Sequence, residues 1–225
     1  MSMDTELSAE HHSKNNKPHL TQHDTLIYVG DPMCSWCYGF SPELDQIKAA
    51  FPDLPFEMVM GGLRAGGNET MMELGEFLHH HWIDVQKASG QPFNFAILSQ
   101  STVTYDTEPA CRATIIVRDM MPEQTYAYFK EIQKGFYFYN NLPNDIDSYL
   151  QPAMKLGIDH NLFVTRYNSQ EAKMAAYEDF ELAQKMGVQG FPALILKSGD
   201  KYYKITDGYQ KASVCIAKIT KAVGR

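Results

Sequence analysis

The chain has 225 residues, 44% hydrophobic and 21% charged, which is typical of one large globular domain or one domain carrying an insertion. A formal net charge of −7 gives no electrostatic reason to expect nucleic acid or an anionic membrane as a partner. Residues 1–22 lack the apolar segment of a secretion signal, and no stretch approaches the roughly 20 apolar residues of a membrane-spanning helix. We therefore expect a cytoplasmic protein with a disordered tail over residues 1–22.

The first elements predicted in chain order are a strand, a helix and a second strand. Residues 25–30 are apolar and β-branched between polar neighbours, which predicts a buried strand. Apolar residues then recur at helical spacing over residues 36–51, and residues 56–60 (FEMVM) predict another strand. Two cysteines, Cys34 and Cys37, stand at the junction between the first strand and the helix.

About 120 residues in the middle of the chain are predicted to be mainly helical, with an irregular segment rich in turn residues over residues 90–109. The helical patterns cover residues 71–89, 108–121, 122–140, 145–156 and 169–186. A shorter helical segment is predicted around Leu162. Each β segment by itself would leave a sheet edge and an apolar face uncovered. The helical block is therefore expected to be an insertion between two halves of one sheet.

The β pattern returns near the end of the chain. Residues 191–205 contain two strand-like runs around a Ser-Gly-Asp turn, which predicts a hairpin, and residues 212–223 predict a last helix. Pro192 directly precedes the first run, a position where a proline is tolerated and where a cis Phe191–Pro192 bond is expected. If both halves join one sheet, this proline loop can lie beside the two cysteines.

The sequence Cys34-Ser35-Trp36-Cys37 carries the clearest chemical signal. The thiolate form of cysteine attacks disulfides, and a helix N-terminus stabilises a thiolate through unpaired N–H groups and the helix dipole. Cys34 is predicted to occupy that position. Cys37 lies one turn further on the same face, where we expect it to be more buried and able to attack a mixed disulfide at Cys34. These two residues are the predicted catalytic pair.

The segments DPMCSWCYGFSPEL (31–44), EPACRA (108–113) and GVQGFP (187–192) resemble the DsbA-like branch of the thioredoxin superfamily. The resemblance is greatest to cytoplasmic members described as protein-disulfide isomerases or DsbA-family oxidoreductases. It implies an α/β, thioredoxin-like fold with a large all-helical insertion. The implied thioredoxin-like domain comprises residues 23–64 and 187–225, and the implied insertion comprises residues 65–186.

The same resemblance implies a role for individual residues. Cys34 would be the nucleophile, Cys37 the resolving thiol, and Pro192 a cis-proline at the border of the substrate groove. Trp36 and Phe191 would flank the reactive sulfur and bind substrate. A disulfide-containing protein or a small thiol would be the substrate, and no metal or organic cofactor would be needed. Glutathione or a thioredoxin-type protein would recycle the dithiol.

The dipeptide between the cysteines differs from that of periplasmic DsbA. It is Ser-Trp instead of Pro-His, so it supplies no positive charge beside the thiolate. We therefore expect a less oxidising couple than that of DsbA, with a preference for disulfide reduction or isomerisation.

Several alternatives remain open at this level. A glutathione-dependent enzyme resembling kappa-class transferases or 2-hydroxychromene-2-carboxylate isomerases would use the same fold, although these typically carry serine at the position of Cys34. A non-catalytic holdase would only present an apolar collar to its clients. Zinc is disfavoured because there is no second CxxC motif, and His79, His80 and His81 fan out on a helix.

Two further residues could have either a chemical or a structural role. Cys111 heads a predicted helix, and we interpret it as a core residue in preference to a third exchanging thiol. Asp31 could accept a proton from Cys37 or shape the turn before Cys34, and we favour the turn.

Overall fold

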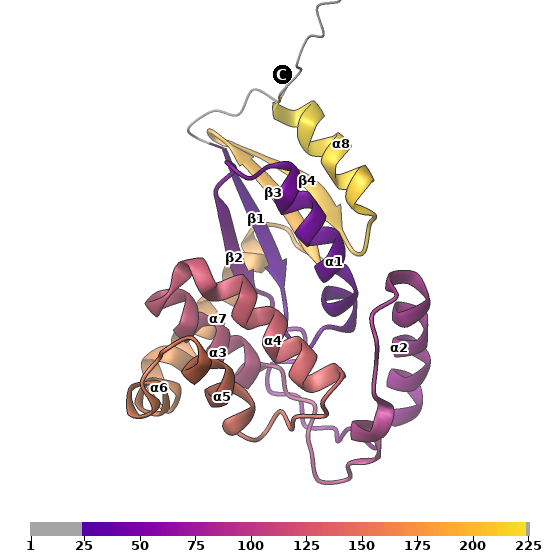
Figure 1. The fold of residues 1–225 in the computed structure, drawn as a ribbon, viewed down its shortest axis with the longest axis vertical. Coiled ribbons are helices and arrows are strands. Elements are labelled where there is room, and N and C mark those ends of the chain that lie inside the picture. The colour runs from indigo at the N-terminus through magenta and orange to yellow at the C-terminus, as the bar shows by residue number, and fades with distance from the viewer. Residues whose placement is uncertain (1–23, 224–225) are drawn as a thin grey trace, which may run out of the picture.

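The computed structural model describes residues 24–223, so the tail predicted over residues 1–22 lies outside the described part (Figure 1). The elements are β1 (Asp24–Gly30), α1 (Ser35–Ala50), β2 (Phe56–Met60), α2 (Gly75–Ser89), η1 (Phe95–Ser99), α3 (Glu108–Met120), η2 (Pro122–Gln124), α4 (Thr125–Tyr137), α5 (Asp147–Lys155), α6 (His160–Tyr167), α7 (Gln170–Lys185), β3 (Ala193–Ser198), β4 (Lys201–Asp207) and α8 (Ala212–Val223). None of the helices within residues 24–223 is long and apolar enough to cross a membrane.

One four-stranded sheet unites the first and last β segments, as the sequence predicted. Its order is β2-β1-β3-β4, with β1 parallel to β2 and antiparallel to β3. The register pairs Val29 with Ala193. The start of β3 therefore lies beside the end of β1, which brings the Phe191–Pro192 loop to the end of the sheet where the CxxC motif begins.

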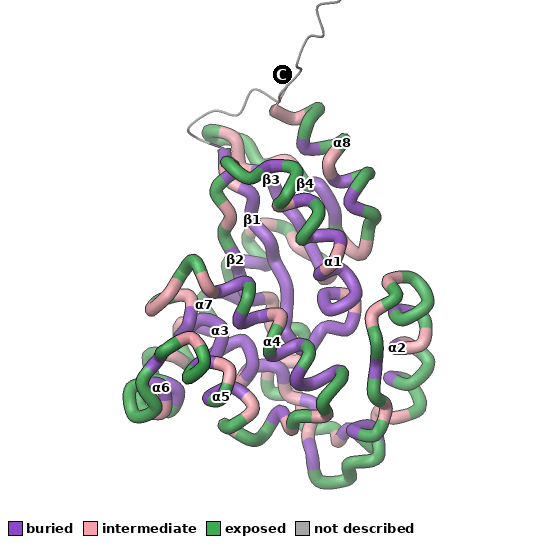
Figure 2. The backbone as a smooth tube through the Cα atoms, viewed as in Figure 1, coloured by how far each residue is buried: buried purple, intermediate pink, exposed green. Residues whose placement is uncertain are grey.

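The two faces of the sheet are covered by different parts of the chain. On β1, Leu26 and Tyr28 belong to the apolar cluster that includes residues of α1, α4 and α8, whereas Ile27 and Val29 join a smaller cluster with Ala183 of α7. This alternation is expected of a strand that is buried on both faces. In Figure 2, β1, the first part of β3 and the start of α1 are accordingly buried.

The helices between β2 and β3 confirm the predicted helical insertion. Helices α3 to α7 gather below the sheet in Figure 1, and α2 stands apart from them beside the start of α1. Their shared core contains large, fully buried rings, among them Trp82, Tyr128 and Phe163.

Two predicted helices are shorter in the structure. Helix α2 begins at Gly75, because Thr70 and the Glu73 carboxylate form a hydrogen-bonded turn over the preceding residues. Helix α4 begins at Thr125, after a short 3₁₀ turn that starts at Pro122.

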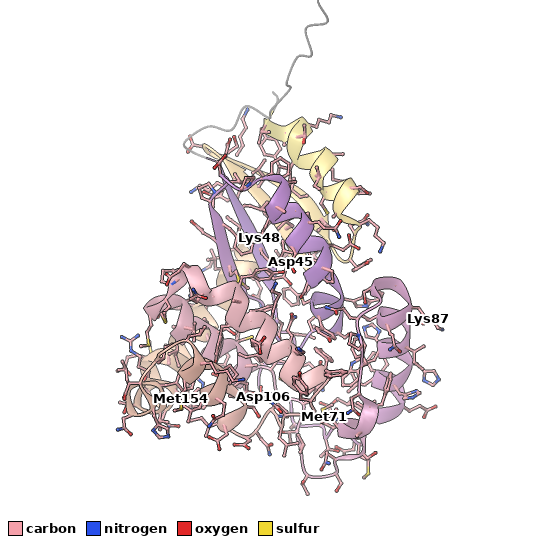
Figure 3. The ribbon with its side chains drawn as sticks, viewed as in Figure 1. Asp45, Lys48, Met71, Lys87, Asp106 and Met154 are labelled. Carbon is pink, nitrogen blue, oxygen red and sulfur yellow. The ribbon has the colours of Figure 1, made fainter. Side chains whose placement is uncertain are left out.

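Charged side chains connect α1 to the insertion and to β2 (Figure 3). The ammonium nitrogen of Lys130 on α4 lies 2.8 Å from an Asp45 carboxylate oxygen on α1. Lys48, one turn further along α1, lies over the Phe56 ring at 3.5 Å from its centroid. Both contacts involve the second half of α1, away from its first turn. They therefore hold the helix in place without involving the cysteines.

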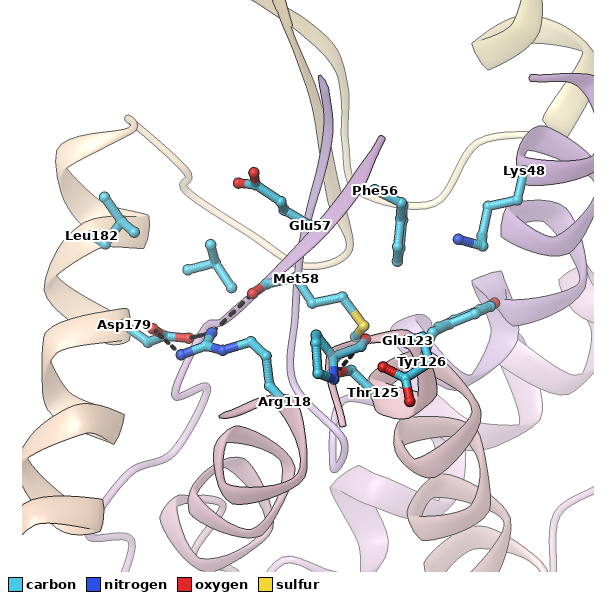
Figure 4. Close-up of a pocket in the computed structure, with 12 residues that line it drawn as sticks. Lys48, Phe56, Glu57, Met58, Arg118, Glu123, Thr125, Tyr126, Asp179 and Leu182 are labelled. Atoms are coloured by element: carbon cyan, nitrogen blue, oxygen red, sulfur yellow. Dashed lines mark hydrogen bonds and ion pairs between the residues drawn. The ribbon is translucent and has the colours of Figure 1, made fainter. Parts of the chain in front are cut away.

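The outer edge of β2 is covered in part by side chains from α3 and α7 (Figure 4). Arg118 donates to the Met58 carbonyl at 2.9 Å, and the Met60 N–H donates to the Asp179 carboxylate at 2.8 Å. Arg118 and Asp179 also form an ion pair at 2.6 Å. A cavity of about 530 Å³ lies beside this edge, and the CxxC cysteines do not line it.

Candidate active site

The two motif cysteines lie at the beginning of α1, as predicted. Cys34 is the N-cap residue in an extended conformation (φ −90°, ψ 116°), and its carbonyl accepts the Tyr38 N–H at 3.0 Å. This places the residue at the positive end of the helix dipole. Cys37 follows within the first turn and is fully buried, whereas 5% of Cys34 is exposed. The expected order of burial is therefore confirmed.

The loop before β3 closes over Cys34. The Phe191–Pro192 peptide bond is cis, as expected, and the Cys34 thiol donates to the Phe191 carbonyl with the sulfur 3.8 Å from the oxygen. The Phe191 ring lies against Gly61, where an added Cβ would come within 2.2 Å of a ring carbon. Glycine at this position therefore lets the aromatic side chain pack closely against the backbone after β2.

The environment of Cys37 is apolar apart from a few hydrogen-bonding groups. Burial, followed by the hydrogen bond and charge of the neighbouring Cys34 sulfur, raises the pKa of the Cys37 thiol well above its usual value. A hydrogen bond from Tyr28 and another from the Asp31 backbone oppose this rise in pKa. Cys37 is therefore a protonated thiol in the neutral range.

Asp31 shapes the loop that carries the motif. Its carboxylate accepts the N–H groups of Met33 at 2.8 Å and Leu63 at 2.7 Å, and it also accepts the Cys111 thiol at 3.4 Å. The Tyr105 hydroxyl donates to the Met33 carbonyl. Burial raises the pKa of the Asp31 carboxyl. These contacts agree with the turn-shaping interpretation of Asp31, and they place Cys111 in a fully buried site.

A cleft of about 320 Å³ opens beside Cys34. One wall is Trp36 and Phe191, which the sequence predicted, and Pro192 is buried behind it. The opposite wall comes from the insertion and includes Phe77 and His81 of α2. The two walls meet where His81 packs edge-on against the Trp36 ring, with ring centroids 5.9 Å apart.

The insertion wall of the cleft was not predicted. Phe77 is 66% exposed, which is uncommon for a phenylalanine. A phenylalanine on the solvent face of an amphipathic helix is the signal in the sequence that could have indicated this wall. Leu63 and Arg64 reach the cleft from the loop after β2, which has no pattern of its own. Burial lowers the pKa of His81, although the Asp84 carboxylate opposes that change.

Comparison with known proteins places this geometry in a family. The model of the DSBA-like thioredoxin domain matches residues 25–212. The chain belongs to this family. No curated protein matched the chain.

Several solved structures are similar to the chain. A candidate protein disulfide isomerase of Nitrosomonas europaea has 32% identity and a TM-score of 0.81, with 89% of this chain and 97% of that one covered. The cytosolic disulfide reductase DsbM of Pseudomonas aeruginosa has 21% identity and a TM-score of 0.69 over 80% and 88% of the two chains, and it has also been solved with glutathione. A 2-hydroxychromene-2-carboxylate isomerase has 16% identity and a TM-score of 0.60, covering 89% and 95%. The last two share the fold.

Proposed function

We propose that this protein is a thiol–disulfide oxidoreductase of the disulfide reductase or isomerase type. The observation that carries the proposal is the pairing of Cys34, the N-cap residue of α1, with the fully buried Cys37 in the first turn of the same helix. Cys34 attacks a substrate disulfide and forms a mixed disulfide. Cys37 then attacks the Cys34 sulfur, which releases the substrate thiol and leaves a disulfide between the two cysteines.

The burial of Cys37 suits the second step of this reaction. A buried thiol does not compete for the incoming disulfide, so the first attack falls to the more accessible Cys34. Burial is the main cause of the raised pKa of Cys37 and it persists, but once Cys34 is bound to substrate its sulfur no longer adds a charge that raises this pKa further. The resolving thiol therefore ionises more readily at the stage when it is needed.

The cleft supports two kinds of substrate: a protein disulfide flanked by apolar groups, or the disulfide of a small thiol. Trp36 and Phe191 provide the aromatic surface beside Cys34, and Pro192 supports the loop behind them. A volume of about 320 Å³ is at the lower end of the range for ligand pockets, roughly 300–1,000 Å³. Extended protein substrates would use the apolar surface that continues onto Phe77, which is exposed.

Glutathione is the proposed reductant that returns the Cys34–Cys37 disulfide to the dithiol. The fold that the chain shares with DsbM, which has been solved with glutathione, supports this partner. The scheme needs no metal and no organic cofactor, because both redox equivalents are stored in the two sulfurs. We place the reaction in the cytoplasm, where glutathione keeps such a couple reduced.

A glutathione-dependent transferase or isomerase is the second candidate, because the chain shares its fold with a 2-hydroxychromene-2-carboxylate isomerase. Such chemistry needs one group that binds or activates the glutathione thiol. It gives no role to a second cysteine one helical turn after the first, which favours the dithiol reaction here.

The test is to treat the reduced protein, a Cys37→Ser variant and a Cys34→Ser variant with oxidised glutathione, and to follow the products by intact mass. The proposal predicts an internal disulfide in the wild type, one stable glutathione adduct in Cys37→Ser and no adduct in Cys34→Ser. A wild-type protein that retains glutathione without losing two hydrogens would favour the transferase or isomerase instead.

A further inference from the structure

Arg64 is the one permanently charged residue, among residues 24–223, that lines the cleft beside Cys34. The other lining side chains are apolar, aromatic or neutral polar groups. Burial lowers the pKa of His81 in this lining, so its ring is neutral at pH 7. The proposed function gives Arg64 no role, although it lies in the same cleft as the attacking sulfur. A single cation in a mainly apolar cleft is the arrangement expected of a site that recognises one negative group.

The guanidinium group of Arg64 lies at the wall of this cleft. Its central carbon is 5.6 Å from the centroid of the Tyr105 ring, and Tyr105 lines the same cleft. The Arg64 side chain is 30% exposed, so a ligand can reach part of it. Its charge therefore acts at the surface that a bound substrate contacts.

The loop that carries Arg64 is fixed by hydrogen bonds to the segment before α3 and to the loop before α1. The Arg64 N–H donates to the Thr107 hydroxyl at 3.1 Å, and the Arg64 carbonyl accepts the Thr107 N–H at 3.3 Å. One residue earlier, the Leu63 N–H donates to the Asp31 carboxylate at 2.7 Å. Asp31 also shapes the turn before Cys34, so one carboxylate positions both the loop and the attacking cysteine. The site is thus organised before a substrate arrives, which lowers the cost of binding.

The hydrogen-bonding capacity of Arg64 is only partly used. Its Nη2 atom pairs with the Glu69 carboxylate, and within residues 24–223 its buried Nε atom has no hydrogen-bond partner. A guanidinium group binds a carboxylate best through two parallel hydrogen bonds. The Glu69 side chain is 48% exposed, and an ion pair between side chains this exposed contributes little to stability. An incoming carboxylate can therefore displace Glu69 at small cost.

We propose that Arg64 is a specificity-determining residue that binds the carboxylate of a small disulfide substrate, in place of Glu69. This inference rests on the proposed function. The cleft volume of about 320 Å³ fits a small molecule better than an extended chain. In the reaction, the Cys34 thiolate forms a bond to one substrate sulfur, and the substrate S–S bond breaks with its electron pair on the departing sulfur, which takes a proton from solvent. The carboxylate stays ionised, so Arg64 exchanges neither a proton nor an electron.

Other charges oppose an anion and must be separated from the effect of Arg64. The chain carries a formal net charge of −7, and an open hollow beside the cleft is lined in part by Glu73, Glu76 and Asp84. Salt at an ionic strength of about 0.15 M limits the reach of these charges to about 8 Å. The comparison is therefore made at that ionic strength, between variants of one protein, with two disulfides that differ in charge and little in size.

The experiment measures the second-order rate constants for oxidation of the reduced protein by 3,3′-dithiodipropionate, a dicarboxylate, and by its neutral diamide. Samples are quenched with acid, and the protein that has lost two hydrogens is counted by intact mass. Arg64→Gln removes the charge, Arg64→Lys keeps the charge without the planar fork, and Glu69→Gln removes the resident carboxylate. Arg166→Gln is the matched control, because this exposed arginine of α6 does not line the cleft and its loss changes the net charge equally.

The expected result is a selective loss in Arg64→Gln, which should react about 5- to 20-fold more slowly with the dicarboxylate and less than about 2-fold more slowly with the diamide. Arg64→Lys should lie between Arg64→Gln and the wild type. Glu69→Gln should react about 2- to 5-fold faster with the dicarboxylate, because Arg64 loses a competing carboxylate. Arg166→Gln should match the wild type with both disulfides.

A purely structural ion pair predicts another pattern, because loss of either partner would then have the same effect. Equal slowing of both disulfides in Arg64→Gln, or an unchanged preference in that variant, overturns the role of Arg64. So does a Glu69→Gln variant that reacts no faster with the dicarboxylate, and this second variant decides alone if Arg64→Gln does not fold. A wild type that loses two hydrogens with neither disulfide contradicts the proposed function instead.

Discussion

Asp179 joins helix α7 to the outer edge of the sheet, and its replacement by alanine should lower the free energy of unfolding by about 2–3 kcal/mol. Its carboxylate accepts three hydrogen bonds, two from Arg118 at 2.6 and 3.1 Å and one from the Met60 N–H at 2.8 Å. Met60 is fully buried, so the alanine variant leaves its N–H without a partner, which costs about 1–3 kcal/mol.

The part of this loss of unfolding free energy that comes from the broken ion pair with Arg118 is smaller than for a fully buried pair. Removing one partner of a fully buried pair costs about 3–5 kcal/mol. The Arg118 side chain is 27% exposed, so its charge regains water and is screened by salt once Asp179 is removed. In a chain of this size, about 2–4 °C of melting temperature corresponds to each kcal/mol, so the midpoint should fall by roughly 5–10 °C.

Urea unfolding followed by circular dichroism measures this change, and thermal melting provides a second reading. Glu181→Ala is the matched control on the same helix. Its ion pair with Lys185 spans 3.3 Å with both side chains about 70% exposed, so the loss should be no more than about 0.5 kcal/mol. If Asp179→Ala were as stable as Glu181→Ala, the account of how the β2 edge is held would be refuted.

Three further predictions concern α1, the cleft and the third cysteine. Burial would raise the pKa of Glu43, but hydrogen bonds from the Ala212 N–H and from side chains near it hold it below the usual value, so the carboxylate stabilises the fold above the unfolded-state pKa. Glu43→Gln should therefore be less stable in urea at pH 7, and the difference should vanish as pH falls through about 4 and below. Phe77→Ala should raise KM for an apolar disulfide several-fold and leave the stability unchanged. Tyr177→Ala, which removes another exposed aromatic ring, should leave KM unchanged. Cys111→Ala should keep the dithiol–disulfide interconversion, because its buried thiol bonds a carboxylate and takes no part in exchange.

Each of these has a clear contrary result. If Glu43→Gln lost the same stability at every pH, the charge of Glu43 would not be what stabilises its hydrogen bond with the Ala212 N–H. Equal KM values in the two aromatic variants would remove α2 from the substrate cleft. Loss of turnover in Cys111→Ala, measured with insulin as the disulfide substrate, would make Cys111 an exchanging thiol.

The features that the sequence predicted are those that depend on neighbours along the chain. The strand before Cys34, the helix after it and the hairpin after Pro192 are local patterns, and all three lie where they were expected. The last helix, residues 212–223, was also predicted within its observed bounds. The meeting of the two halves in one sheet followed because each half by itself would leave apolar surface uncovered.

The features that were missed depend on where distant segments settle in space. Tyr28 has the pattern of an ordinary core residue in a buried strand, and only the fold brings it into the same apolar cluster as Cys34 and Cys37. The cleft wall formed by Phe77 and His81 depends on how α2 leans against the start of α1, which no local periodicity encodes. In the run of three histidines, His79 packs on Phe95 and against the His80 ring, whereas His81 packs on the motif tryptophan.

The central claim, that Cys34 and Cys37 form one exchanging couple, is tested most directly by equilibrium titration with reduced and oxidised glutathione. The two species are trapped with acid and counted by mass. The account predicts clean interconversion of dithiol and internal disulfide, with a reduction potential near or below the cytosolic range of roughly −220 to −320 mV. A stable glutathione adduct, or bound glutathione with no internal disulfide at any ratio, would contradict it.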